Sequence, residues 1–73
     1  MTELAKKLGN RLRQLRRSTD LTQEGLAEAV NVSVEFISNL ERGVNAPSFK
    51  TLEKLAKALH RPVKDFFDFD QAI

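Results

Sequence analysis

The sequence predicts an all-α domain of five short helices. Apolar residues recur at intervals of three and four along the whole chain, and no segment alternates as a strand does. Serine or threonine precedes several of these periodic runs, where the side chain can cap a helix N-terminus. The 73 residues include no cysteine and one histidine, so neither disulfides nor an ordinary zinc site can compensate for a small core. We therefore expect residues 1–73 to form one domain stabilised by close helix packing and self-association.

The first two helices are expected before residue 31. The first covers residues 2–18, and its apolar stripe consists of Leu4, Leu8, Leu12 and Leu15. The second is capped by Thr22 and ends at about Val30. Its inward residues are Leu26, Ala27 and Val30. Asp20 and Leu21 form the short connection between the two helices.

Three further helices follow. Ser33 is expected to cap the third helix and Gly43 to end it. Its inward residues are Phe36, Ile37 and Leu40. Ser48 caps a fourth helix with the apolar residues Leu52, Leu55, Ala56 and Leu59. Pro62 suits the first position of a short fifth helix that contains Val63, Phe66 and Phe67.

Charge is distributed unevenly, although the net charge is only +2. The basic residues near the N-terminus are Lys6, Lys7, Arg11, Arg13, Arg16 and Arg17, and the acids near the C-terminus are Asp65, Asp68 and Asp70. This asymmetry indicates one face for a polyanion and another for a different partner. No segment approaches the ~20 apolar residues of a membrane span, and the N-terminus lacks a signal peptide. We expect a soluble cytoplasmic protein.

The second and third helices are joined by only about three residues, 31–33, and must therefore cross steeply. Ala27 supplies a small residue at the crossing. Asn31 is one of the few non-glycine residue types that adopt positive φ at low cost. The apolar anchors of this unit are Leu26, Val30, Val32, Ile37 and Leu40.

The run TQEGLAEAVNVSVEFISNLERG resembles the helix-turn-helix motif of the Cro/lambda-repressor (XRE-type) family. Gln23 opens the motif, and Asn31 stands where the family usually has glycine. The resemblance extends from about Arg11 to Phe67. It implies a compact lambda-repressor-like DNA-binding domain in which helices 2 and 3 form the motif, at about residues 22–42. It also implies a homodimeric transcription regulator, and the size and Phe-rich end resemble restriction-modification controller proteins.

Helical geometry identifies an exposed face on the third helix. At about 100° per residue, Ile37 and Leu40 point away from a mixed set of hydrogen-bonding and small side chains. The base-reading candidates in this set are Val34, Glu35, Ser38 and Asn39. Asn39 can pair with adenine and Glu35 can accept from cytosine in a major groove about 12 Å wide. Glu35 can alternatively stabilise the helix N-terminus.

Other residues are expected to bind the DNA backbone or to hold the motif in place. The resemblance implies that Gln23 grips a phosphate. The remaining phosphate candidates are Arg42, Asn45, Lys50, Arg11 and Arg17. The resemblance also implies an ion pair between Arg16 and Glu41 that fixes the third helix against the first.

The aromatic C-terminus, residues 60–73, is the expected dimerisation segment. Its interface candidates are Phe66, Phe67 and Phe69, accompanied by Val63 and Ile73. A symmetric dimer would place two reading helices ~34 Å apart on a near-palindromic operator. The same acidic, aromatic segment also fits an alternative function, a protein-interaction module such as an antitoxin.

The sequence does not suggest an enzyme. It shows no nucleophile beside a base, no paired histidines and no phosphate-cradling glycine loop. We expect no catalytic residue, metal, cofactor, membrane partner or small-molecule effector.

Overall fold

The computed structural model describes residues 2–70 and is helical throughout, with no strand in that range. Its elements are α1 (Glu3–Ser18), α2 (Gln23–Val30), α3 (Val34–Glu41), α4 (Phe49–Ala58) and the 3₁₀ helix η1 (Val63–Phe67). The prediction of a fifth α-helix is therefore wrong. Only five residues lie between Pro62 and Asp68, no side chain caps their N-terminus, and they form tight 3₁₀ turns instead.

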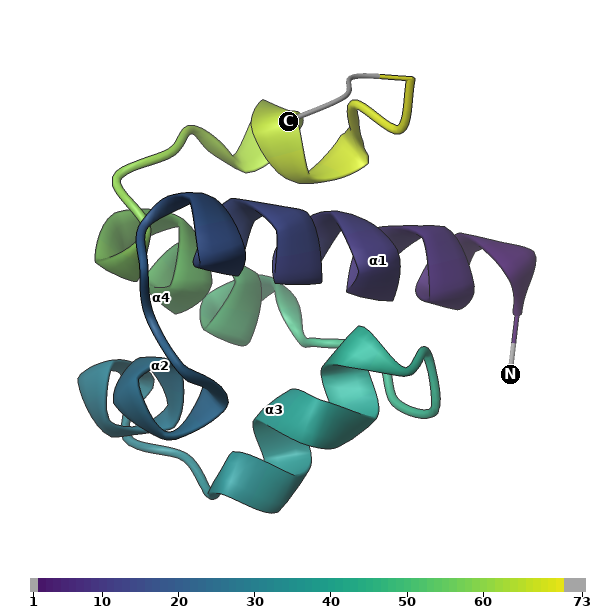
Figure 1. Ribbon diagram of the computed structural model, residues 1–73. Coiled ribbons are helices and arrows are strands. Elements are labelled where there is room, and N and C mark those ends of the chain that lie inside the picture. The colour runs from purple at the N-terminus through teal and green to yellow at the C-terminus, as the bar shows by residue number, and fades with distance from the viewer. Residues whose placement is uncertain (1, 71–73) are drawn as a thin grey trace.

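The helices surround one core (Figure 1). The helix α1 contacts α3 on one side and η1 on the other, so η1 lies across α1 from the α2–α3 pair. The helix α4 lies behind α1 in this view and contacts α2 and η1. None of the helices within residues 2–70 has the length and apolar character needed to cross a membrane.

Each α-helix begins with a hydroxyl cap. The side-chain oxygens of Thr22, Ser33 and Ser48 accept backbone N–H groups three residues later, as the sequence predicts. Thr2 does the same for α1 and so precedes the helix rather than belonging to it. Such caps satisfy N–H groups that have no partner within the helix, and each contributes about 1 kcal/mol.

Each of the four α-helices also ends in a Schellman motif. A left-handed residue stands at the C-cap of α2 and directly after the C-cap of the other three helices, and the residue that follows it donates back to a carbonyl of the last turn. The left-handed residues are Asp20, Asn31, Gly43 and His60, with φ between 56° and 76°. Asn31 therefore takes the positive φ expected at the tight turn between α2 and α3, with φ 60° and ψ 50°.

The core consists mainly of leucines from α1 and α4, the anchors of α2 and α3, and Phe66 from η1. Phe36 and Val32 pack against its edge and are only partly buried. Leu4 was expected in the apolar stripe of α1 but is 54% exposed. The N-terminal end of α1 extends past the other helices (Figure 1).

The helices α1 and α3 approach each other closely at Gly9. A Cβ atom built there would lie 2.3 Å from the Leu40 carbonyl oxygen and 2.7 Å from that of Glu41. Only glycine fits this contact without moving a backbone. Gly9 therefore lets α1 sit directly against the C-terminal turn of α3.

Candidate nucleic-acid interface

The two sides of α3 differ in burial, as its periodicity predicts. Ile37 and Leu40 are 0% and 2% exposed and anchor the helix in the core. Val34 is 40% exposed, Glu35 is also exposed, and Ser38 and Asn39 are half-buried. The four base-reading candidates thus retain accessible surface on the side of α3 that the core leaves free.

A buried ion pair connects α1 with the end of α3. Arg16 Nε donates to Glu41 Oε2 at 2.6 Å, and Arg16 Nη2 donates to Oε1 at 3.1 Å. The remaining guanidinium nitrogen, Nη1, donates to the Leu21 carbonyl at 2.7 Å. The structure thus contains the pair expected between Arg16 and Glu41, in a two-pronged geometry that fixes orientation as well as distance.

Glu41 accepts further hydrogen bonds, and these affect its protonation. Gln23 Nε2 donates to Oε1 at 3.0 Å, and Arg13 Nε lies 3.5 Å from the same atom. Burial alone would raise the pKa of Glu41. The hydrogen bonds from Arg16 and Gln23, the charge of Arg16 and the hydrogen bond from Arg13 outweigh burial and lower that pKa below 4.5.

Two of the side chains expected to bind phosphates already have hydrogen-bond partners within the protein. Arg11 is buried, and its Nε donates to the Asp65 carbonyl at 2.7 Å. The prediction for Arg11 is therefore wrong, since this guanidinium ties α1 to η1. Gln23 is half-buried and bound to Glu41, so a phosphate contact would require its amide to move or to share a donor.

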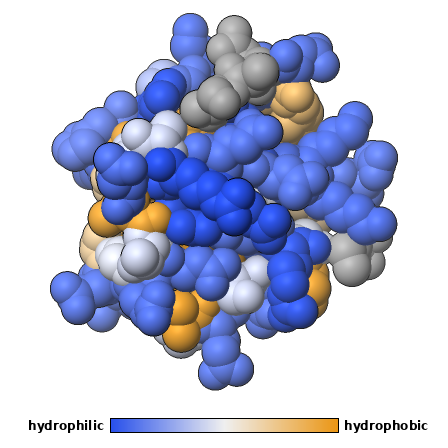
Figure 2. All heavy atoms as spheres, viewed as in Figure 1, coloured by the Kyte–Doolittle hydropathy of each residue, from blue (hydrophilic) through white to orange (hydrophobic). Residues whose placement is uncertain are grey.

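The other phosphate candidates, Arg17, Arg42, Asn45 and Lys50, are exposed. Sequence reasoning did not assign Lys6 and Arg13, which also lie near the end of α3. Arg13 reaches Glu41, and a Cβ on Gly43 would lie 2.7 Å from Lys6 Cα. Hydrophilic side chains cover most of the face seen in Figure 2, and its apolar areas are small and separate.

The three interface phenylalanines occupy different environments. Phe66 is 0% exposed and belongs to the core, so its assignment to a dimer interface is wrong. Phe67 is 42% exposed, and its ring packs edge to face against that of Phe69, with the ring centroids 6.1 Å apart. The Phe69 ring lies 6.0 Å from Lys7 Nζ on α1 and is half-buried. Ile73 lies outside the described residues.

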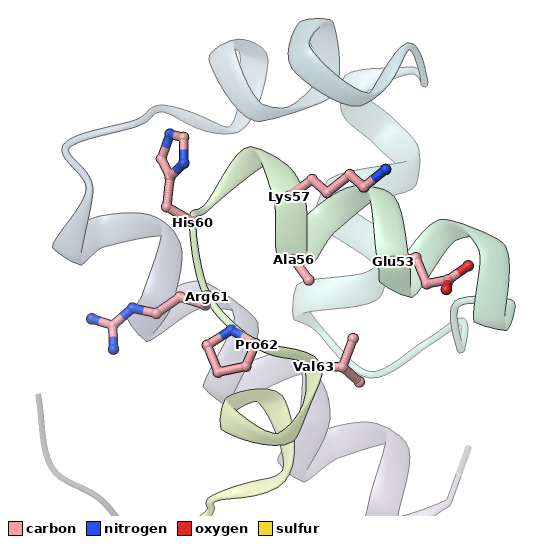
Figure 3. Close-up of a pocket in the computed structure, with 7 residues that line it drawn as sticks. All are labelled: Glu53, Ala56, Lys57, His60, Arg61, Pro62 and Val63. Atoms are coloured by element: carbon pink, nitrogen blue, oxygen red, sulfur yellow. The ribbon is translucent and has the colours of Figure 1, made fainter.

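An open concavity of about 520 Å³ lies between α4 and η1 (Figure 3). Its lining residues are Glu53, Ala56, Lys57, His60, Arg61, Pro62 and Val63. They come from the second half of α4, the turn after it and the start of η1. Within residues 2–70, no group of three metal-ligating side chains lies close enough together to hold an ion, here or elsewhere.

Comparisons with known proteins agree with the arrangement of α2 and α3 described above. A family model described as "Helix-turn-helix" matches residues 12–66. The chain is 40% identical over 62 residues to the HTH-type transcriptional regulator DdrOP3 of Deinococcus deserti, covering 85% of this chain but only 48% of that regulator. It is 39% identical to control protein C.BamHI of Bacillus amyloliquefaciens, covering 84% of this chain and 76% of that protein.

A solved structure is also similar to this chain. The restriction-modification controller protein C.AhdI from Aeromonas hydrophila superposes with a TM-score of 0.83 and 35% identity, over 86% of this chain and 96% of that one. These three relatives are regulators or control proteins, and none is an enzyme.

Proposed function

Because the chain belongs to the helix-turn-helix family, whose model matches residues 12–66, we propose that it binds double-stranded DNA in a sequence-specific manner. The helix α3 lies in the major groove with its free side toward the bases. The protein acts as a homodimeric transcription regulator on a near-palindromic operator.

The observation that carries this proposal is the rigid support of α3. Its apolar side is buried at Ile37 and Leu40, and its last turn is held by the Arg16–Glu41 pair. The opposite side offers short side chains that can reach base edges: Val34, Glu35, Ser38 and Asn39. A helix held in this way reads bases without first having to become ordered.

Affinity for the DNA backbone is supplied by polar and basic residues that retain accessible surface. Arg17, Asn45 and Lys50 remain our phosphate candidates, and Lys6 and Arg13 now join them. Each neutralised phosphate releases counterions, so binding weakens steeply as salt rises. The carboxylate of Glu35 opposes the phosphates, and it either accepts from cytosine or stabilises the start of α3.

Dimensions of the domain are compatible with a dimer on DNA. Two reading helices ~34 Å apart each lie ~17 Å from the two-fold axis. The described chain measures 27 × 24 × 20 Å, so two copies in direct contact span that distance. Our proposed contact between them is η1, on which Val63 and Phe67 are exposed, with the adjoining end of α4.

In vitro selection from random duplexes tests the proposal, followed by titration of the selected duplex and a scrambled one. We expect the selected sequence to bind about 10³-fold more tightly or better. We expect Lys50→Ala to weaken both complexes alike and to reduce the salt slope by about one unit.

A matched lysine provides the control. Lys7 lies against Phe69 on the η1 side of α1, so Lys7→Ala should leave affinity and salt slope unchanged. Equal, weak and salt-sensitive binding to every duplex would contradict sequence-specific regulation. That result would favour the alternative of a module whose main partner is another protein.

A further inference from the structure

Asn39, one of the four base-reading candidates, has a hydrogen-bond partner on α3. A guanidinium N–H of Arg42 donates to Asn39 Oδ1. Arg42 is exposed and forms no ion pair within residues 2–70. A hydrogen bond with one charged partner is about twice as strong as a neutral one, so this contact orients the Asn39 amide.

The backbone under this pair is well fixed. Arg42 caps the C-terminus of α3, and its N–H donates to the Ser38 carbonyl at 3.0 Å. The Asn39 carbonyl accepts the N–H of Val44 at 2.9 Å within the Schellman motif. Residues three apart on a helix are neighbours on its surface, so the turn keeps the two side chains side by side.

We propose that Asn39 and Arg42 read one base as a single unit and that this unit prefers guanine. The inference rests on the proposed placement of α3 in the major groove. It changes the expected role of Arg42 from a phosphate contact to a specificity-determining residue. It also changes the base expected for Asn39, which would be adenine for an asparagine acting alone.

Hydrogen-bonding chemistry supports guanine. Asparagine recognises adenine by donating its NH₂ group to N7 and accepting from the N6 amino group through Oδ1. In this protein the guanidinium already donates to Oδ1, and although that oxygen has a second lone pair, the positive charge of Arg42 disfavours the adenine amino group beside it. The pair instead offers the Asn39 NH₂ group and the remaining N–H groups of Arg42, all of them donors. Guanine presents two acceptors, N7 and O6, in the major groove.

Selection of bound duplexes by the wild type, Arg42→Met and Asn39→Ala tests this pairing. Methionine keeps an unbranched arm but has neither charge nor N–H donors. We expect the wild type to select guanine at one position of each half-site, about tenfold over adenine. Arg42→Met should shift that position toward adenine because Oδ1 becomes free, and Asn39→Ala should relax the preference at the same position.

Lys50→Met serves as the control because Lys50 is an exposed cation on α4, whereas the hydrogen bond to Asn39 comes from Arg42. It should select the wild-type sequence with uniformly lower affinity. The inference is wrong if Arg42→Met likewise keeps the wild-type preference, or if the two α3 variants relax different positions. A wild-type protein that selects no sequence would refute the proposed function as well, and the two failures are therefore distinguishable.

Discussion

Glu41 shows at the level of a single residue how a buried charge is compensated. Its side chain is 0% exposed, yet both carboxylate oxygens have donors from α1, and Gln23 of α2 adds another. A buried ion pair adds little net stability compared with apolar residues, but losing one partner leaves an uncompensated charge. The pair therefore acts mainly to fix α3 in one orientation.

Replacing Glu41 with glutamine should destabilise the protein by about 3 kcal/mol at pH 7, because Arg16 loses its counter-charge in the interior. The folded-state pKa of Glu41 is lowered, so its contribution is fully present above pH 4.5 and declines as pH falls below that value. The difference in the free energy of unfolding between the wild type and Glu41→Gln should therefore be smaller at pH 3 than at pH 7. Urea unfolding at pH 7 and pH 3 measures both effects.

The control for this prediction is Glu28→Gln, since Glu28 is exposed on α2 and forms no ion pair within the described residues. That variant should unfold like the wild type at both pH values. An equal loss for Glu41→Gln at pH 7 and pH 3 would show that the carboxylate charge contributes nothing.

At the scale of elements, the helix ends decide where the chain turns. The four Schellman motifs follow the same hydrogen-bonding pattern, but only the one after α3 uses glycine. Non-glycine residues in the left-handed region cost about 1–2 kcal/mol, less for Asn and Asp. Asp20 carries an additional penalty, because its negative charge lies at the negative end of the α1 dipole.

Asp20→Gly should therefore stabilise the protein by about 0.5–1 kcal/mol, after allowing for the greater freedom of glycine in the unfolded chain. Thermal unfolding followed by circular dichroism measures the change. Thr19→Gly is the matched control one residue earlier, where φ is −102° and the Thr19 hydroxyl donates to the Arg16 carbonyl. Thr19→Gly should destabilise the protein. A change in stability of the same sign for both variants would contradict the argument from backbone conformation.

Local features of these elements could be predicted from sequence, and long-range contacts could not. The caps at Thr22, Ser33 and Ser48 depend on residues three positions away, so spacing alone identifies them. The partner of Arg11 lies 54 residues further along the chain, and a single arginine gives no sign of it. The need for glycine at position 9 likewise depends on carbonyls of α3. Phe67 and Phe66 are adjacent aromatics, and only the three-dimensional packing distinguishes the exposed ring from the core one.

At the scale of the whole molecule, the apolar surface is unevenly exposed. Phe49 is 88% exposed at the first position of α4, which the sequence did not suggest. Val63 and Phe67 are both exposed on η1, and Val63 lines the concavity of Figure 3 together with the basic residues Lys57 and Arg61. Asp68 follows Phe67, so this surface carries both charges and suits contact with a second copy.

Phe67→Asp should raise the dissociation constant of the proposed dimer about 30-fold or more, the effect expected of losing an aromatic anchor from an interface. Sedimentation velocity across micromolar concentrations measures it. Leu4→Asp changes another exposed apolar residue, which is 54% exposed against 42% for Phe67, and should leave association unchanged. Unaltered association of Phe67→Asp, or equal weakening by both variants, would place the interface on another surface.

The Schellman motifs have a further consequence for how quickly the protein reaches its fold. Each one turns the chain within a few residues, so that α2 meets α3 and α4 meets η1 after only short loops have closed. Helical domains with such local connections fold within microseconds to milliseconds. Newly synthesised chains would then fold almost at once. The amount of folded protein would follow synthesis and degradation without a delay for folding.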